Sequence, residues 1–217
     1  MTCNSIGSNA VSRNHLTVVN TPGEAQSDAA PSATIDAASF PESALADLYT
    51  CWRGFGRHGE VPARAAIDPT ALPRKLLPNL SIIERLPPDE DQGTGERFRY
   101  RLAGTAIEQA AGRTLTWCYF DELLPANRYG RHVHWQLRTL LARRAAVYSE
   151  GAYLTSVDGK LGVRTTCHLM LPLTDEAGEI RYVLAAQTFG TLSNLNHAPF
   201  LLADDFRPGR TAVVRGA

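Results

Sequence analysis

The chain has 217 residues, 44% of them hydrophobic, which is enough for one domain with extensions. Lysine plus arginine and aspartate plus glutamate both number 22, so the chain lacks the excess positive charge that nucleic acids and anionic membranes attract. The four cysteines lie far apart without the spacing of a zinc site, and no apolar run is long enough to cross a bilayer. Since no signal peptide is visible, we expect a cytoplasmic protein with reduced thiols, no metal site, no nucleic-acid partner and no membrane association.

The N-terminal region divides into a polar arm, a helix and a connector. Residues 1–38 are rich in Ser, Asn, Thr and Ala, so we expect a mostly disordered arm. Residues 39–79 begin with an amphipathic helix over about 42–56, followed by a connector that four prolines keep irregular. The apolar residues of this helix recur at helical spacing: Leu45, Leu48, Tyr49 and Trp52.

Two strands are indicated next, over residues 80–86 and 96–103. In the second strand apolar and basic residues alternate, which predicts one apolar face and one arginine face. The apolar face would carry Phe98, Tyr100 and Leu102, and the opposite face Arg97, Arg99 and Arg101. Gly104 then suits a tight turn into a short helix, because glycine tolerates positive φ.

The remaining elements are a block of helices and three more strands. Short helical turns are expected over residues 116–124, and Asn127 is placed to cap a longer helix that ends near Arg144. Strands are then predicted over about 147–154, 162–173 and 180–189. The tail, residues 191–217, has weak signals, and we expect a loose end from Arg207.

This order of elements predicts an α+β fold. Runs of strands separated by helices favour a five-stranded antiparallel sheet with helices on one face, preceded by the amphipathic N-terminal helix. The core domain would span residues 80–190.

The same order, with several short motifs, resembles a family of stand-alone bacterial PAS-like proteins, the MopJ-type motility regulators. The resemblance covers roughly residues 45–190. The motifs are Trp52, Pro62-Ala-Arg64, Ile67-Asp68-Pro69, Leu76-Leu77-Pro78, Arg99-Tyr-Arg-Leu-Ala-Gly-Thr105 and Leu171-Pro-Leu173. It implies a sensory or regulatory module for bacterial signal transduction that binds small molecules or proteins and has no catalytic residues. Any output would pass through a separate signalling protein.

A ligand pocket would lie between the sheet and the helices in such a module. The aromatic content of the elements expected there gives the candidate lining residues. They are Tyr100, Trp117, Phe120, His134, Leu137, Tyr148 and Phe189. The cofactor is unknown, since a haem ligand at His134 would rest on analogy alone and nothing supports a flavin.

Two other functions stay open. The chain could be a ligand-free interaction module that forms a homodimer, because PAS-like domains often pair through such an N-terminal helix. Its interface candidates are Leu45, Leu48, Tyr49, Trp52, Arg99 and Arg101. Less favoured is an enzyme whose site would combine Glu84, Arg99, Arg101 and His168 on the polar face of the sheet.

Overall fold

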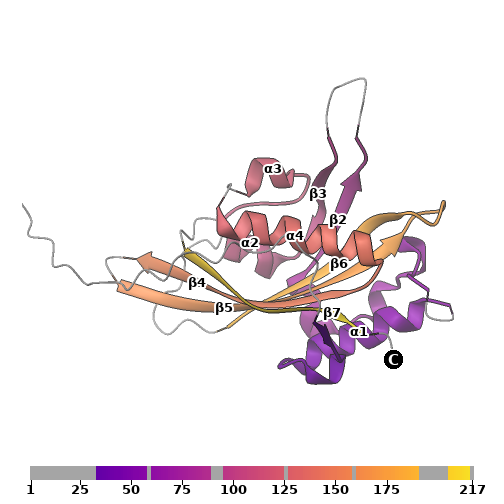
Figure 1. Ribbon diagram of the computed structural model, residues 1–217, viewed down its shortest axis with the longest axis horizontal. Helices are drawn as coiled ribbons and strands as arrows, with labels where there is room; N and C mark the ends of the chain where they lie inside the picture. The colour runs from indigo at the N-terminus through magenta and orange to yellow at the C-terminus, as the bar shows by residue number, and fades with distance from the viewer. Residues whose placement is uncertain are drawn as a thin grey trace, which may run out of the picture.

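The computed structural model describes residues 33–57, 60–88, 95–124, 127–157, 160–190 and 205–215. These residues form a seven-stranded sheet with helices on both faces (Figure 1). Along the sheet the strands lie in the order β1-β7-β4-β5-β6-β2-β3. Their bounds are Thr34–Ile35 (β1), Leu80–Leu86 (β2), Arg97–Ala103 (β3), Val147–Val157 (β4), Lys160–Thr174 (β5), Ile180–Phe189 (β6) and Asp205–Val214 (β7).

The α-helices lie close to the positions that the periodicity predicts. They are α1 (Ser43–Phe55), α2 (Thr105–Ala111), α3 (Phe120–Leu123) and α4 (Arg128–Arg143). Asn127 caps α4 as expected, since its Oδ1 accepts a hydrogen bond from Gly130 N at 3.0 Å. The connector after α1 contains short 3-10 turns rather than regular helix, in keeping with its prolines. None of the helices in these described ranges is long and apolar enough to cross a membrane.

The sheet is two strands wider than the five-stranded prediction. Strands β3, β2, β6, β5 and β4 pair antiparallel, as expected. Strand β7 then adds to β4, where we predicted a loose end, and β1 pairs in parallel with β7 from within the predicted arm. We did not predict β7 because Pro208 and Gly209 are typical of turns. Its pairing with β4 shifts register beside them, and the run 211–214 is rich in β-branched residues. The rest of the arm, residues 1–32, and the segment 191–204 lie outside the described residues.

Each face of the sheet carries its own apolar core, so helices cover both faces rather than one. Helices α2, α3 and α4 pack on what we call the inner face, together with residues such as Phe98 and Val183. Helix α1 and the connector pack on the outer face (Figure 1), where Leu169 and Leu171 meet them. Because side chains alternate along a strand, neighbouring residues of the central strands supply the two cores.

The end of β3 departs from the predicted alternation. A bulge leaves Arg101 without a partner in the ladder, since Ile82 pairs with Leu102 and Ile83 with Tyr100. This extra residue turns Leu102 away from the inner core, and its side chain is 52% exposed. Gly104 follows with an ordinary φ of −72°, so positive φ is not its role. Instead, a Cβ there would lie 2.3 Å from the Pro78 carbonyl oxygen, so the close approach of two backbones requires glycine.

Candidate functional site

The inner core contains a group of buried polar side chains between α4 and the sheet, which we call the polar cluster. Its members come from α4 and from strands β4, β5 and β6. They are Tyr129, His132, Gln136, Tyr153, Thr166, His168 and Gln187. Polar groups are rarely gathered inside an otherwise apolar core unless hydrogen bonds or a bound molecule satisfy them. This cluster is therefore the part of the interior most suited to binding.

Direct contacts join the members of the polar cluster. Gln187 Nε2 donates hydrogen bonds to Tyr153 Oη at 3.1 Å and to Thr166 Oγ1 at 3.3 Å. The ring of Tyr129 meets the ring of Tyr153 edge-on, with centroids 5.4 Å apart, and that of His168 at 6.4 Å. Gln136 Nε2 donates to Ser149 Oγ on β4. The cluster thus ties α4 to three neighbouring strands.

Burial keeps the polar cluster uncharged at neutral pH. It lowers the pKa of His132 to about 4, helped by the charge of Arg128, and the pKa of His168 to about 3, helped by the neighbouring His132. Burial likewise raises the pKa of the Tyr129 and Tyr153 phenols, so both stay protonated. A molecule bound among these residues would meet neutral donors and acceptors, while Arg128 and Arg164 are charged neighbours of His132 and Tyr153.

Two atoms of the polar cluster have no hydrogen-bond partner among the described residues. They are His168 Nε2 and Gln136 Oε1, and both lie in side chains that are almost fully buried. An unsatisfied buried polar atom costs about 1–3 kcal/mol, so such atoms call for a water molecule or a ligand. Gln136 Oε1 can only accept a hydrogen bond, whereas neutral His168 Nε2 donates or accepts according to its tautomer.

The C-terminal strand helps to close this interior. Phe206 of β7 packs against Tyr129, Tyr153 and His132, with ring centroids 5.2 to 5.3 Å apart. Gly151 of β4 leaves room for the ring, because a Cβ there would lie 2.5 Å from it. Phe206 therefore forms part of the wall beside the polar cluster.

The structure does not bring the seven predicted pocket residues together. Tyr100, Phe120 and Leu137 are buried in the inner core, and Phe189 packs at its edge. Tyr148 instead lies on the outer face, stacked on Phe40 with centroids 4.4 Å apart. The prediction from aromatic content combined residues of both faces, because it did not take account of the alternation of side chains along β4.

The other two predicted pocket residues, Trp117 and His134, lie nearer the surface. Trp117 is 54% exposed and has a positive φ of 72°, a conformation that strains a residue with a Cβ. Its ring lies under the Arg101 guanidinium, 4.4 Å from its carbon, rather than over the interior. His134, on the far side of α4 from the polar cluster, lines a separate surface cleft.

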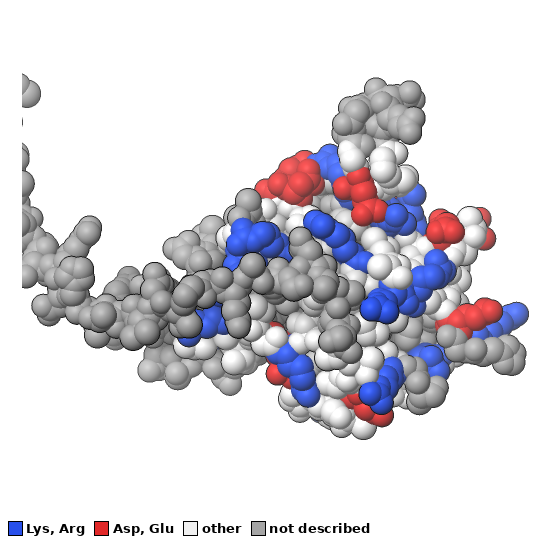
Figure 2. Space-filling view, viewed as in Figure 1, with Lys and Arg blue, Asp and Glu red and all other residues white. Residues whose placement is uncertain are grey.

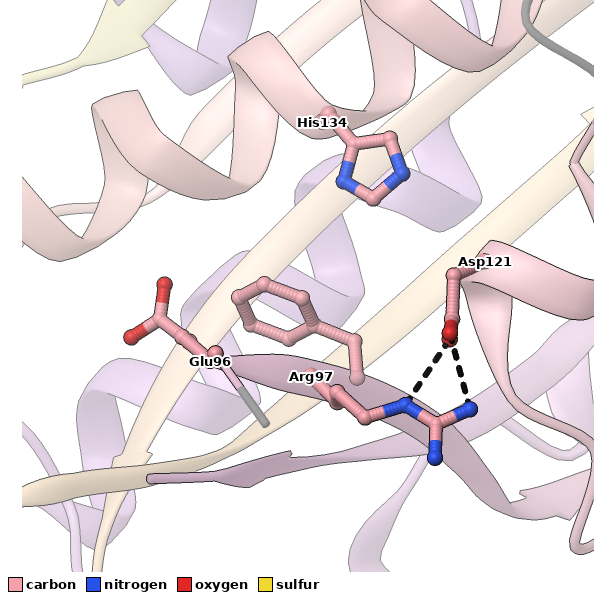
Figure 3. Close-up of a pocket in the computed structure, with 6 residues that line it drawn as sticks. Glu96, Arg97, Asp121 and His134 are labelled. Atoms are coloured by element: carbon pink, nitrogen blue, oxygen red, sulfur yellow. Dashed lines mark hydrogen bonds and ion pairs between the residues drawn. The ribbon is translucent and has the colours of Figure 1, made fainter. Parts of the chain in front are cut away.

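This surface cleft has a volume of about 500 Å³ and lies between β3, α3 and α4 (Figure 3). Its lining residues are Gly95, Glu96, Arg97, Phe98, Asp121 and His134. Arg97 and Asp121 form an ion pair at 2.8 Å, and Arg85 pairs with Glu96 at 2.6 Å, so the charges of the cleft are largely matched. Partial burial and Arg138 lower the pKa of His134, and Asp121 opposes them. Among the described residues that line the cleft, no buried side-chain nitrogen or oxygen lacks a hydrogen-bond partner.

Of the predicted arginine face of β3, Arg99 and Arg101 lie beside Glu84 of β2, whereas Arg97 reaches Asp121 and Glu122 of α3. Arg99 Nε donates to Glu84 Oε2 at 2.8 Å, and Arg101 lies 3.9 Å from the same oxygen. His168, which the enzyme hypothesis grouped with these three, belongs to the inner face with Met170, its neighbour two residues along β5. The four residues therefore do not form one site.

The apolar interface candidates of α1 lie inside the chain. Leu45, Leu48, Tyr49 and Trp52 are all buried in the outer core. Trp52 Nε1 donates to the Pro172 carbonyl at 2.9 Å, and Tyr49 Oη donates to that of Arg215 at 2.8 Å. These side chains cover the sheet of their own chain.

Most of the polar cluster was missed by the sequence analysis. On α4, residues 129, 132 and 136 follow helical spacing, but their polar character suggested no buried face. In β5, the alternation of residues 166, 168 and 170 could have shown that Thr166 and His168 share a face with Met170. The sequence signal of the cluster was therefore polar residues at the helical and strand spacings that buried apolar residues usually follow.

A strand order of β3-β2-β6-β5-β4, with helices between β3 and β4 packed on one face, is the arrangement of a PAS-type domain. A family model described as PAS domain matches residues 41–187, which is more than half of the chain. The chain therefore belongs to the PAS domain family, as the resemblance implied at that level. No curated protein and no solved structure matches it.

Proposed function

We propose that this PAS domain is a sensory module that binds a small, uncharged polar molecule in the inner core, beside α4. The observation that supports this most is the pair of buried atoms without a partner, His168 Nε2 and Gln136 Oε1, inside a cluster of neutral polar groups. A hydrogen-bond donor on the ligand would serve Gln136, and a second polar atom would serve His168. An ionised ligand would lose its hydration among the neutral side chains of the cluster, which disfavours its binding there.

We propose binding rather than catalysis as the role of the polar cluster. The aliphatic hydroxyl groups in and beside the cluster already have hydrogen-bond partners, since Thr166 Oγ1 donates to the Thr188 carbonyl at 2.9 Å and Oγ of neighbouring Ser149 accepts from Gln136. Neither hydroxyl is paired with a histidine that could take its proton, which nucleophilic catalysis would need. A molecule held by groups of this kind would be bound without being activated.

The signal would leave the domain through α4. One side of this helix carries Tyr129, His132 and Gln136, and the other side faces solvent. A ligand that changes the hydrogen bonds of Gln136 would move the helix relative to the sheet, because the cluster ties the two together. A separate signalling protein would read that change.

Native mass spectrometry of the purified protein tests the proposal, with its denatured mass as the reference. We expect an additional mass that is lost on denaturation, and expect its loss in Gln136→Leu and His168→Leu. Thr174→Val is the matched control, because Thr174 is a buried polar residue on the outer side, beside the Pro62 carbonyl. A wild-type protein with no additional mass, or variants that retain it, would contradict a ligand in this cluster.

The same spectra count the copies of the chain in each particle. A homodimer stays a prediction, and α1 cannot form it through its apolar face while that face is buried against its own sheet. A dimer would therefore use other surfaces.

A further inference from the structure

The solvent face of α4 carries arginines at almost every exposed position. The exposed residues of this helix are Arg128, Arg131, Arg138, Ala142 and Arg143, and the helix contains no Asp or Glu. Lysine and arginine side chains gather over α4 in the space-filling view (Figure 2). This concentration is unusual in a chain whose basic and acidic residues are equal in number.

The helical repeat places these arginines on one side. Residues 128, 131, 135, 138 and 142 follow each other at intervals of three or four, so they form one stripe along the helix. At about 1.5 Å per residue, the stripe spans about 20 Å. Half-buried Trp135 interrupts it, and Arg143 lies beside its C-terminal end. We call this surface the α4 arginine face.

Stability of the helix does not explain the α4 arginine face. Positive charges near a helix N-terminus oppose its dipole, yet Arg128 is the first residue of α4 and Arg131 follows in the same part of the helix. Only Arg143 lies in the last turn, where the helix dipole favours a positive charge. Acidic residues at the start would stabilise the helix better, so helix stability does not account for the arginines there.

Pairing within the chain does not explain it either. On β3 each arginine faces a carboxylate, Arg97 with Asp121 and Glu122, and Arg99 with Glu84. In contrast, Arg128, Arg138 and Arg143 form no ion pair with any carboxylate in the described part of the chain. Arg128, Arg138 and Arg143 are thus positive charges of the α4 arginine face whose counter-charges are not supplied by the described residues.

We propose that the α4 arginine face docks an acidic segment of a partner protein. Charge complementarity selects an anionic partner, and guanidinium groups pair well with carboxylates. The face is confined to one helix, and α3, with the exposed carboxylates of Asp121 and Glu122, lies across the surface cleft from His134 of the same helix. A nucleic acid would extend its phosphates over those carboxylates, whereas a short acidic segment ends before them. The proposal holds whether or not the interior binds a ligand.

Fluorescence anisotropy with a labelled deca-glutamate peptide tests the docking surface, with double-stranded DNA of 20 base pairs as a parallel probe. The variant Arg128→Glu/Arg138→Glu reverses two charges of the face. We expect it to weaken peptide binding at least about tenfold at low salt, since two ion pairs become repulsive. We also expect wild-type binding to weaken as salt is raised.

The matched control is Arg64→Glu/Lys75→Glu, which changes the net charge equally but lies in the connector, where both side chains are exposed. It should bind the peptide like the wild type. Equal loss in both variants, or no wild-type binding, would overturn the proposal. DNA binding that is tighter than peptide binding and is lost with Arg128 and Arg138 would replace it with a nucleic-acid surface.

Folding of the variants can be checked independently of binding. Arg128→Glu places a negative charge at the N-terminus of α4, so the thermal midpoint should stay the same or rise. Should the double reversal unfold the domain, Arg128→Gln/Arg138→Gln removes the charges without reversing them. Unchanged peptide binding in that folded variant would also refute the docking surface.

Discussion

The two buried histidines make a quantitative prediction for stability against pH. In the folded chain the pKa of His132 is lowered to about 4 and that of His168 to about 3, whereas an unfolded histidine has a pKa of about 6.5. Between these values the unfolded chain binds protons that the folded chain does not. The free energy of unfolding therefore rises with pH in this window and falls as the pH is lowered from 7 to 5.

The size of the effect follows from the linkage relation. Each histidine contributes about 1.4 kcal/mol per pH unit once the pH lies below 6.5 and above its folded pKa. At pH 5 this amounts to about 2 kcal/mol for each residue, or about 4 kcal/mol together, out of a typical total of about 5–15 kcal/mol. The phenols of Tyr129 and Tyr153 remain protonated throughout and add nothing.

Urea unfolding at pH 7 and pH 5 measures the difference. The variant His168→Leu should lose only about half as much stability over this range as the wild type. Tyr129→Phe is the control, because it alters the same cluster without removing an imidazole, and its pH dependence should match the wild type. If His168→Leu keeps the full pH dependence, His168 is not a buried neutral histidine.

Two further changes test the packing around the interior. Gly104→Ala should destabilise the domain by about 1–3 kcal/mol in thermal unfolding, because its Cβ would lie 2.3 Å from a backbone oxygen that cannot move aside; an unchanged midpoint would show that this approach is looser. Phe206→Ala should cost about 3–5 kcal/mol in urea unfolding through the space left beside Tyr129 and Tyr153. Adding Gly151→Ala, which is destabilising alone, should be tolerated once the ring is gone, and strictly additive losses would contradict the contact.

The regular elements could be predicted because their patterns are local. Strand β2 has the predicted bounds, α1 differs by one residue at each end, and Asn127 is the predicted N-cap of α4. Strand β7 could not be predicted in the same way, because Pro208 and Gly209 are typical of turns, and only the edge of β4 allows them in a strand. A local sequence pattern does not show which edge strand of a sheet a distant segment will pair with.

The candidate site was harder to predict than the fold. Large aromatic residues such as Tyr148 and Trp117 suggested a pocket, but one lies on the outer face and the other is exposed. The polar cluster consists of residue types that are mostly exposed, such as glutamine, or intermediate in burial, such as histidine, so sequence alone did not place His132 or Gln136 in the interior. Their burial depends on α4 packing across β4 and β5, which is a tertiary property.

The pairing of β1 with β7 has a consequence for how the protein folds. Arg215 Nε donates to Thr34 Oγ1 at 2.6 Å, a contact across 181 positions of the chain. Contacts between such distant residues require the closure of a very long loop, which slows their formation. We therefore expect this edge of the sheet to assemble last and to open first, with amide hydrogens that exchange faster than those of β5 and β6. The central strands of the sheet would therefore form early in folding, and the edge made by β1 and β7, from the two ends of the described chain, would form late.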